Sequence, residues 1–181
     1  VFVDDCSSDT SVKLIHELFQ GTDFTVLTKE KNEGPGHSFN LGMEWVIAHS
    51  KNIEKDILVT MEADCTSDVE ILPAMVTLSK LGYDFVLASV YAQGGGFQKT
   101  SFLRKSLSFA ANMLFRAIYD VKVLTLSSFY RVYSLSSLQK IKAKYGILIK
   151  EPGFICMFEL LIKAISIRAT TIEVPMQLKS D

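Results

Sequence analysis

Residues Ile57–Asp68 read ILVTMEADCTSD, a short apolar run that leads directly into a group of acids. The run Ile57–Met61 is rich in β-branched residues and apolar on both faces, which is typical of a strand buried between two layers. Glu62 and Asp64 follow at a spacing that points both side chains the same way in an extended segment. Such acids repel each other unless a cation lies between them, and Mg²⁺ or Mn²⁺ would leave coordination positions for phosphate oxygens. The residues thus predict a metal site, a polar turn or both, because Ser67 and Glu70 match a capping box while Glu62 and Asp64 remain available to bind.

Length and composition place the chain among single-domain globular proteins. Of its 181 residues 48% are hydrophobic and 22% charged, which is ordinary for such a domain. The net charge of −1 provides no basic field for nucleic acid. Three scattered cysteines suit neither a disulfide framework nor a zinc site, so a cytosolic setting is expected. The chain begins in what reads as the middle of a strand, so we expect a segment truncated at both ends.

Strand and helix patterns alternate through the first half of the chain. Strands are predicted at 1–3, 24–28, 57–61 and 84–89, with helical patterns between them. This alternation favours a parallel sheet covered on both faces. The second half is predicted to contain a glycine-rich loop at 90–97, a long helix with apolar positions from 103 to 118, a strand at 127–133, helices at 134–144 and 154–167, and a closing strand at 168–174 stopped by Pro175.

Loops that follow the predicted strands carry the candidate site residues, because ligands of open parallel sheets bind beyond the carboxyl ends of the strands. Asp4 and Asp5 lie upstream of the helix cap expected at Ser8 or Asp9, where a carboxylate could accept hydrogen bonds from a nucleobase or ribose. Asn32–Gly42 places glycines before a helix, which suits either a phosphate cradle or an ordinary strand-to-helix turn. It is neither a P-loop nor G-x-G-x-x-G, which disfavours kinases and dinucleotide enzymes.

Taken in order, these segments resemble family 2 inverting glycosyltransferases of GT-A fold, and most closely their polyprenyl-phosphate (dolichol-phosphate) mannosyltransferase branch. The matching pieces are Val3-Asp4-Asp5-x-Ser7-x-Asp9, Asn32-x-Gly34-x5-Asn40-x-Gly42, Met61-Glu62-Ala63-Asp64, Ser128-Phe-Tyr-Arg131-x-Tyr133, Glu159-Leu-Leu-x-Lys163 and Ile172-Glu173-Val174-Pro175. The likeness covers nearly the whole chain. It implies a three-layer α/β/α, Rossmann-like domain with a mostly parallel central sheet, in which residues 1–89 form a nucleotide-binding half and residues 90–181 an acceptor-binding half.

The resemblance also implies a role for each matching residue. The nucleotide would be held by Asp4, Asp5, Ser7, Asn32 and Gly34. The metal, Mg²⁺ or Mn²⁺, would be held by Glu62, Asp64 and Thr66, and phosphate on the donor or acceptor would be met by Arg104, Ser128 and Arg131. Asp64, Arg104 and Arg131 would be catalytic, since guanidinium groups suit phosphate. The alternatives are a solvated helix face for Arg104 and a water-facing strand charge for Arg131.

Three positions depart from the family pattern. Glu62 stands where the first acid of Asp-x-Asp is usual, Thr125 where this branch has Asp, and Phe129 where the family segment has Gly. A longer first acid can still bind a metal but moves the ion. The changes at Thr125 and Phe129 concern the acceptor more than the donor.

The function implied is transfer of a sugar, with inversion, from GDP-mannose or a UDP-hexose to an acceptor such as polyprenyl or dolichyl phosphate. This implies work at the cytoplasmic face of a membrane, with any membrane association through parts outside the segment. A hydroxyl acceptor would need a general base, for which Glu159 is a candidate unless it pairs with Lys163. The loop Gln93–Gly96 would be a lid or a simple connection. The alternatives are a nucleotidyltransferase, which should be basic and glycine-rich near its first strand, and a glycosyltransferase-like interaction module without catalysis.

Overall fold

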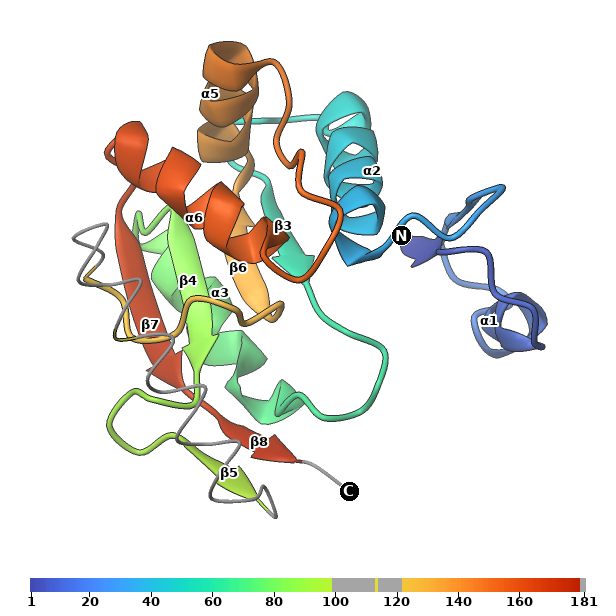
Figure 1. Cartoon of the computed structure of the whole chain (residues 1–181), viewed down its shortest axis with the longest axis horizontal. Helices are drawn as coiled ribbons and strands as arrows, with labels where there is room; N and C mark the ends of the chain where they lie inside the picture. The colour runs from blue at the N-terminus through green and yellow to red at the C-terminus, as the bar shows by residue number, and fades with distance from the viewer. Residues whose placement is uncertain (99–112, 114–121, 180–181) are drawn as a thin grey trace.

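The centre of the molecule is a four-stranded sheet, seen in a computed structural model that describes residues 1–98, 113 and 122–179 (Figure 1). Its strands lie in the order β3 (Ile57–Thr60), β6 (Arg131–Ser134), β4 (Phe85–Ser89) and β7 (Thr171–Pro175). β4 and β7 are parallel, whereas β6 is antiparallel to β3 and to β4. Three of the four strands therefore run in the same direction, as the prediction of a mostly parallel sheet requires, and β6, from the second half of the chain, is inverted between two of them.

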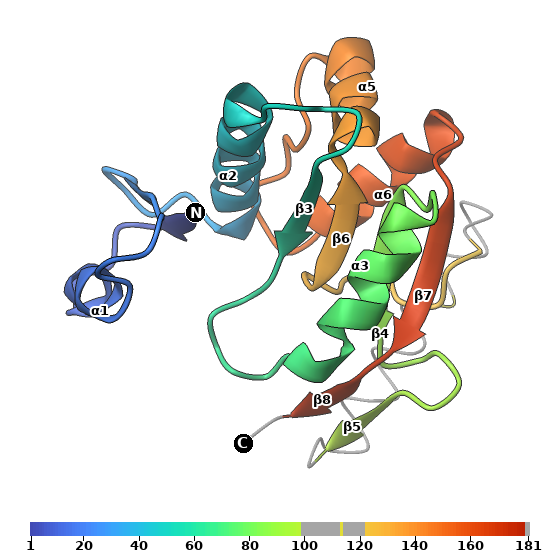
Figure 2. The same cartoon turned by 180° about the vertical axis from the view of Figure 1, so that it is seen from behind.

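Helices cover both faces of this sheet, which confirms the three-layer α/β/α prediction. On one face lie α2 (Pro35–His49), α5 (Leu135–Tyr145) and α6 (Cys156–Ser166), and on the other lies α3 (Leu72–Lys80) (Figures 1 and 2). All of β4 is buried, because its successive side chains point to opposite faces of the sheet and helices cover both faces. Phe85 packs with α2, α5 and α6, whereas Val86 packs with α3.

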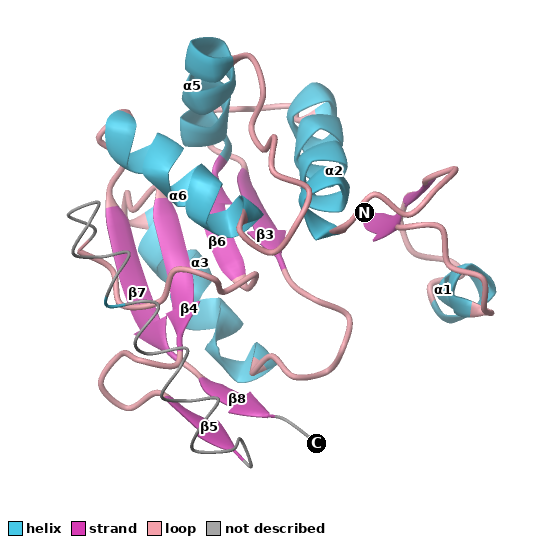
Figure 3. Ribbon diagram, in the orientation of Figure 1, coloured by secondary structure: helices cyan, strands magenta, loops and turns pink. Residues whose placement is uncertain are grey.

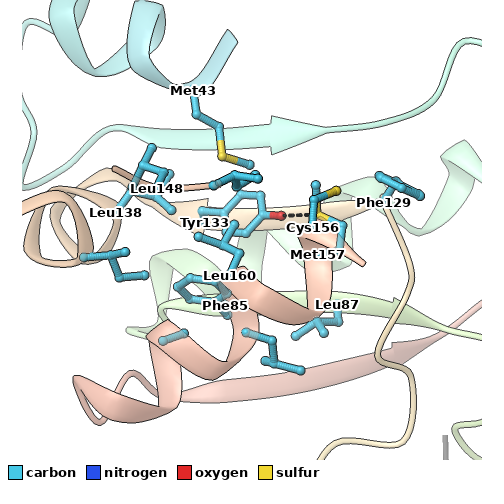
Figure 4. Packing of buried hydrophobic residues seen from close by; sticks show 14 of the residues in the cluster. Met43, Phe85, Leu87, Phe129, Tyr133, Leu138, Leu148, Cys156, Met157 and Leu160 are labelled. Atoms are coloured by element: carbon cyan, nitrogen blue, oxygen red, sulfur yellow. Dashed lines mark hydrogen bonds between the residues drawn. The ribbon is translucent and has the colours of Figure 1, made fainter. Parts of the chain in front are cut away.

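The larger core lies between the sheet and the group of three helices. Figure 4 shows Met43, Phe85, Tyr133 and Leu160 packed there, with the Tyr133 hydroxyl donating to the sulfur of Met157 at 3.6 Å. The rings of Phe85 and Tyr133 meet edge to face at 4.9 Å between centroids. This apolar layer fixes β6 between β3 and β4, and so fixes where the segment before β6 can run.

The amino-terminal elements form a separate small unit beside α2 (Figure 3). β1 (Phe2–Asp4) and β2 (Val26–Thr28) pair in parallel, with α1 (Ser11–Leu18) between them in the chain. A Cβ on Gly42 would come within 3.0 Å of Val3, so glycine allows α2 to approach β1 closely. Among the described residues no ladder joins this pair to the four-stranded sheet, so the four predicted strands do not form one sheet.

A second small sheet was missed by the sequence patterns. β5 (Gly96–Gln98) and β8 (Gln177–Lys179) pair in parallel beyond the ends of β4 and β7. β5 lies partly within the predicted glycine-rich loop, and β8 follows Pro175, which was expected to end the closing strand. The long helix predicted from 103 to 118 lies outside the described residues except at Met113.

Helix capping partly agrees with the sequence. The N-cap of α1 is Thr10, without a side-chain cap bond, rather than the predicted Ser8 or Asp9. Asp9 nevertheless accepts a hydrogen bond from the first-turn N–H of Ser11 at 2.9 Å. After β3, the carboxylate of Asp68 rather than Ser67 caps the 3₁₀ helix η1 (Val69–Ile71), because it accepts from the Glu70 N–H at 3.2 Å. In the part of the chain described, no helix is both long and apolar enough to cross a membrane.

Candidate active site

The acidic segment after β3 is held in place at its start. The Thr60 hydroxyl donates to the Phe129 carbonyl at 2.7 Å, which ties the end of β3 to the segment before β6. Glu62 and Asp64 follow and are both exposed. Desolvation, and then the negative charge of Asp64, raise the pKa of the Glu62 carboxyl above its ordinary value. A cation bound between two such carboxylates would offset the effect of the Asp64 charge on Glu62.

These residues fit a hard divalent cation that shares its coordination shell with a substrate. The described residues contain no group of three or more His, Cys, Asp and Glu side chains able to hold a metal alone. Mg²⁺ commonly takes one or two carboxylates and completes its shell with water and substrate phosphates. Thr66 was predicted as a ligand, but its hydroxyl and backbone N–H donate to Asp64 Oδ1 at 2.9 and 3.0 Å. Thr66 thus orients Asp64 and leaves Oδ2 of that carboxylate for a metal.

A pocket of about 140 Å³ lies beside the acidic segment. Its walls come from Glu62 and Ser67, from the end of β4, from the segment Ser127–Tyr130, and from β5 and β8. The structure therefore brings Glu62 and Ser128, predicted as metal and phosphate ligands, to one cavity. Ser128 hydrogen-bonds weakly to the Tyr130 carbonyl at 3.4 Å, so its hydroxyl is oriented within the wall.

Arg131 does not reach this pocket. Its side chain is fully buried, and its guanidinium donates to the carbonyl oxygens of Leu126, Ser128 and Met157 at 2.7, 2.7 and 2.9 Å. Desolvation lowers the pKa of this guanidinium from its usual range, and the hydrogen bonds offset part of the cost of burying the charge. Both expectations for Arg131, a phosphate contact and a strand charge facing water, are corrected here: the residue shapes the turn before β6.

Glu173 in β7 is a further positioning residue that the sequence analysis did not single out. Its carboxylate accepts from the backbone N–H groups of Leu124 and Thr125 at 2.7 and 2.8 Å. The Thr125 hydroxyl lies 2.6 Å from that of Ser89 at the end of β4. Together these contacts place the segment after 122 against the edge where β4 ends, so β6 has to start there and run antiparallel. The sequence signal that could have identified Glu173 was the presence of an acid within the apolar run of β7.

The amino-terminal loops form a second group of predicted residues. The Asp5 carboxylate accepts from the N–H groups of Glu33 and Gly34 at 3.0 and 2.9 Å and pairs with Lys29 at 2.5 Å. Burial opposes ionisation of Asp5, but these bonds and the Lys29 charge hold its pKa below the ordinary value. Asp4 is buried and accepts from the Ser7 N–H at 3.2 Å. Asp5 remains partly exposed, and a carboxylate has lone pairs for further donors.

The glycines before α2 serve the fold rather than an open cradle. The Gly34 N–H donates to Asp5 and also to Asn32 Oδ1 at 3.2 Å, and the Gly36 N–H donates to the Pro152 carbonyl at 2.8 Å. A Cβ on Gly36 would meet the Glu151 carbonyl oxygen at 1.8 Å, so only glycine allows this approach. Of the two predicted alternatives, the structure supports the strand-to-helix turn, because these amides already have acceptors within the chain.

The Asp5 cluster makes a prediction about pH. A lowered pKa means that Asp5 stabilises the fold above its unfolded-state pKa, near the ordinary aspartate value of 3.8. This contribution is lost as the pH falls through the lower folded-state pKa. Asp5→Asn should therefore have a lower urea midpoint than the natural protein near neutral pH and a shallower loss of stability below about pH 4. Urea midpoints measured across this range should show no such change for Asp23→Asn, at an exposed position. Parallel pH curves for the natural protein and Asp5→Asn would contradict the assignment.

The two groups do not share a described cavity. Neither Asp4 nor Asp5 lines the pocket beside Glu62, and neither lines the larger cavity of about 440 Å³ formed by the end of α2, the start of β3 and Leu135. Arg104 lies outside the described residues. Glu159 pairs with Lys163 at 2.6 Å, as the alternative to a general base predicted.

The three-layer fold with paired acids after β3 is that of the GT-A glycosyltransferases. The family model described as glycosyl transferase family 2 matches residues 1–142, and the chain belongs to this family. A dolichol-phosphate mannosyltransferase of Pyrococcus furiosus is 29% identical over 167 residues, which are 90% of this chain and 43% of that protein. A polyprenol monophosphomannose synthase of Mycolicibacterium smegmatis is 26% identical over 96% of this chain and 64% of its own. The chain thus spans less than two thirds of either relative.

Solved structures agree on the fold. Glucosyl-3-phosphoglycerate synthase from Mycobacterium tuberculosis, in complex with Mn²⁺, UDP-glucose and phosphoglyceric acid, superimposes with a TM-score of 0.66 at 18% identity. The match covers 99% of this chain and 60% of that one. The same enzyme with Mg²⁺ and UDP gives a TM-score of 0.64, also at 18% identity, over 98% and 58% of the two chains. At this identity the likeness establishes the fold alone.

Proposed function

We propose that this chain is the catalytic domain of a metal-dependent inverting glycosyltransferase. It would move a sugar from a nucleotide diphospho-sugar, GDP-mannose or a UDP-hexose, to a polyprenyl or dolichyl phosphate. The observation that carries the proposal is the pair Glu62 and Asp64, two exposed carboxylates that follow the end of β3, where Glu62 lines a pocket. Family membership, and relatives named for mannosyl transfer to dolichol phosphate or polyprenol, support the substrate classes.

The residues of the acidic segment would have separate roles in binding the donor. Glu62 and Asp64 would bind Mg²⁺ or Mn²⁺ together with the diphosphate, and Thr66 holds the Asp64 carboxylate in one orientation. The ion, when bound, neutralises charge on the leaving diphosphate. M. tuberculosis glucosyl-3-phosphoglycerate synthase has been crystallised with Mn²⁺ or Mg²⁺ and UDP, which supports a divalent ion here. Asp5 would use its remaining lone pairs for the nucleoside, with Asp4, Ser7, Asn32 and Gly34 shaping that loop.

The acceptor chemistry agrees with a phosphate nucleophile. A phosphate oxygen is already anionic at neutral pH, so its attack on the sugar needs no general base. Glu159, the candidate base, accepts hydrogen bonds from the N–H groups of Lys150 and Glu151 at 2.9 Å and forms an ion pair with Lys163. Its carboxylate is therefore already engaged in structural contacts. Ser128 would orient acceptor or donor phosphate in the pocket, and Arg104 keeps its proposed phosphate role. A lipid-linked acceptor would place the reaction at the cytoplasmic face of a membrane.

The test is sugar transfer by the full-length protein. With Mn²⁺ present, incubation with GDP-mannose or UDP-glucose and a short polyprenyl phosphate should yield the glycosylated lipid phosphate and the free nucleoside diphosphate. Removal of the metal with a chelator should abolish product, and added Mn²⁺ or Mg²⁺ should restore it, because the leaving diphosphate would otherwise stay uncompensated. Mass spectrometry of the lipid fraction provides the measurement. Transfer that persists at the same rate in chelator would contradict a metal-dependent reaction.

A second candidate is an interaction module of the same family without catalysis. Thr125, in place of the carboxylate that this branch carries, is engaged by Ser89 and Glu173, and the Arg131 guanidinium is used internally. Nucleotide binding without any sugar transfer or nucleotide-sugar hydrolysis, across both donors, would favour this candidate over the enzyme.

A further inference from the structure

Tyr130 carries a polar group for which the described part of the chain provides no partner. The residue stands directly before β6, its side chain is 2% exposed, and its ring packs in the α3 layer with Met75, Val86 and Met176. Among the described residues the hydroxyl has no hydrogen-bond partner. A buried hydroxyl without a partner costs free energy, so one that persists calls for a physical explanation.

The same residue belongs to the wall of the pocket beside the acidic segment. Tyr130 lines that pocket together with Glu62, Ser67 and Ser128. Desolvation, and then the nearby charge of Asp68, raise the pKa of the phenol, so the hydroxyl stays protonated and able to donate. The hydroxyl oxygen itself is covered in this structure. Contact between this oxygen and a molecule in the pocket therefore requires the packing that covers the hydroxyl to open.

The chemistry of the walls selects the kind of molecule. The polar groups of the described lining are hydroxyls and one carboxylate, with no Lys, Arg or His among them, and the remainder is apolar or aromatic. The side chains of the described lining offer no positive charge of their own, so a phosphate there would depend on the cation at Glu62, whereas a neutral ring with several hydroxyls would find donors, acceptors and aromatic faces. At about 140 Å³, the pocket is smaller than typical drug-sized sites and suits a single ring.

We propose that Tyr130 is a specificity-determining residue, whose hydroxyl donates a hydrogen bond to a hydroxyl of a sugar ring seated in this pocket. The inference rests on the proposed glycosyltransferase function and adds that this pocket recognises a sugar ring of a substrate. The ring could be the sugar of the donor or a sugar on the acceptor side, since both present the same hydroxyl chemistry.

The test compares sugar-bearing probes with sugar-free ones in the full-length natural protein and in Tyr130→Phe. Calorimetric titrations in Mn²⁺ would use UDP-glucose against UDP, GDP-mannose against GDP, and the methyl α-glycosides of glucose and mannose. Tyr130→Phe should bind a sugar-bearing probe about three- to tenfold more weakly, the range expected for one hydrogen bond, and should bind UDP and GDP as before. A loss confined to nucleotide sugars assigns the ring to the donor, and a loss with methyl glycosides assigns it to the acceptor side.

Two controls separate recognition from folding. Ser79→Ala removes the other buried hydroxyl that lacks a partner among the described residues, and Ser79 does not line the pocket. It should leave every affinity unchanged. In addition, the natural protein should discriminate against one monodeoxy form of the affected probe by the same factor, and Tyr130→Phe should not. The second comparison needs no assumption about how the variant folds, because it is made within each protein.

Two results would overturn the assignment, and they differ in what else they affect. Equal affinity of both proteins for every sugar-bearing probe, with nucleotide binding intact, would make Tyr130 an unpartnered core residue and leave the glycosyltransferase proposal standing. Absence of nucleotide binding by the natural protein in Mn²⁺ would contradict the proposed function itself, and the role of Tyr130 with it.

Discussion

Replacement of Asp64 by alanine is expected to lower kcat for sugar transfer by roughly 10²–10³-fold, the loss typical when one group that stabilises transition-state charge is removed. Glu62 and Asp64 are the two carboxylates available after β3, and desolvation and mutual repulsion already raise the pKa of Glu62. Without Asp64, Glu62 alone would have to hold an ion and the leaving diphosphate. Thr66 would also lose the acceptor that it contacts through two hydrogen bonds.

The matched control for Asp64→Ala is Glu70→Ala. Glu70 is an exposed acid a few residues further along, in η1, and its backbone N–H donates a hydrogen bond to Asp68. Steady-state kinetics on the full-length proteins should show kcat near the natural value for Glu70→Ala. An equal loss in both variants would indicate a general effect of negative charge, and an unchanged kcat in Asp64→Ala would remove Asp64 from the reaction.

Replacement of Arg131 by methionine is expected to destabilise the protein by roughly 3 kcal/mol or more, because three buried carbonyl groups would lose their donor and each unpaired group costs about 1–3 kcal/mol. Those carbonyls belong to Leu126, Ser128 and Met157, so the turn before β6 and the start of α6 would both be affected. Urea unfolding followed by circular dichroism measures the change in free energy.

The control for Arg131→Met is Lys140→Met, which removes a positive charge from the exposed face of α5 and should change stability by less than about 0.5 kcal/mol. The outcome separates two roles for Arg131. A stable Arg131→Met protein with impaired transfer would restore the phosphate contact that the family pattern implied. Loss of stability supports the buried, positioning role that the geometry gives it.

The strands and helices of the described regions were largely predictable because their apolar periods are strong. Phe85–Ser89 is fully buried and Ile57–Thr60 is partly to fully buried, and each strand follows an aspartate, so pattern and structure agree. The direction of β6 was not predictable from its own residues. It follows from contacts of Thr125 and Glu173, which are far apart in the sequence.

Some features of the candidate site were likewise predictable from the sequence, and others were not. The pair Glu62 and Asp64 was found because local spacing after a strand determines where both side chains point. The burial of Arg131 was not, because a motif gives residue types but not whether a guanidinium meets phosphate or backbone carbonyls. The missing hydrogen-bond partner of Tyr130 also needs three dimensions, since it depends on every element packed around its hydroxyl.

The central claim is that Glu62 and Asp64 hold a divalent ion together with the donor diphosphate. Mn²⁺ titrations followed by electron paramagnetic resonance, with and without GDP or UDP, test it most directly on the full-length natural protein and on Asp64→Ala. The account predicts tight Mn²⁺ binding by the natural protein only when nucleoside diphosphate is present, because two carboxylates need the phosphate oxygens to complete the shell. It also predicts loss of that binding in Asp64→Ala. Nucleotide-dependent Mn²⁺ binding of the same strength in both proteins would contradict it.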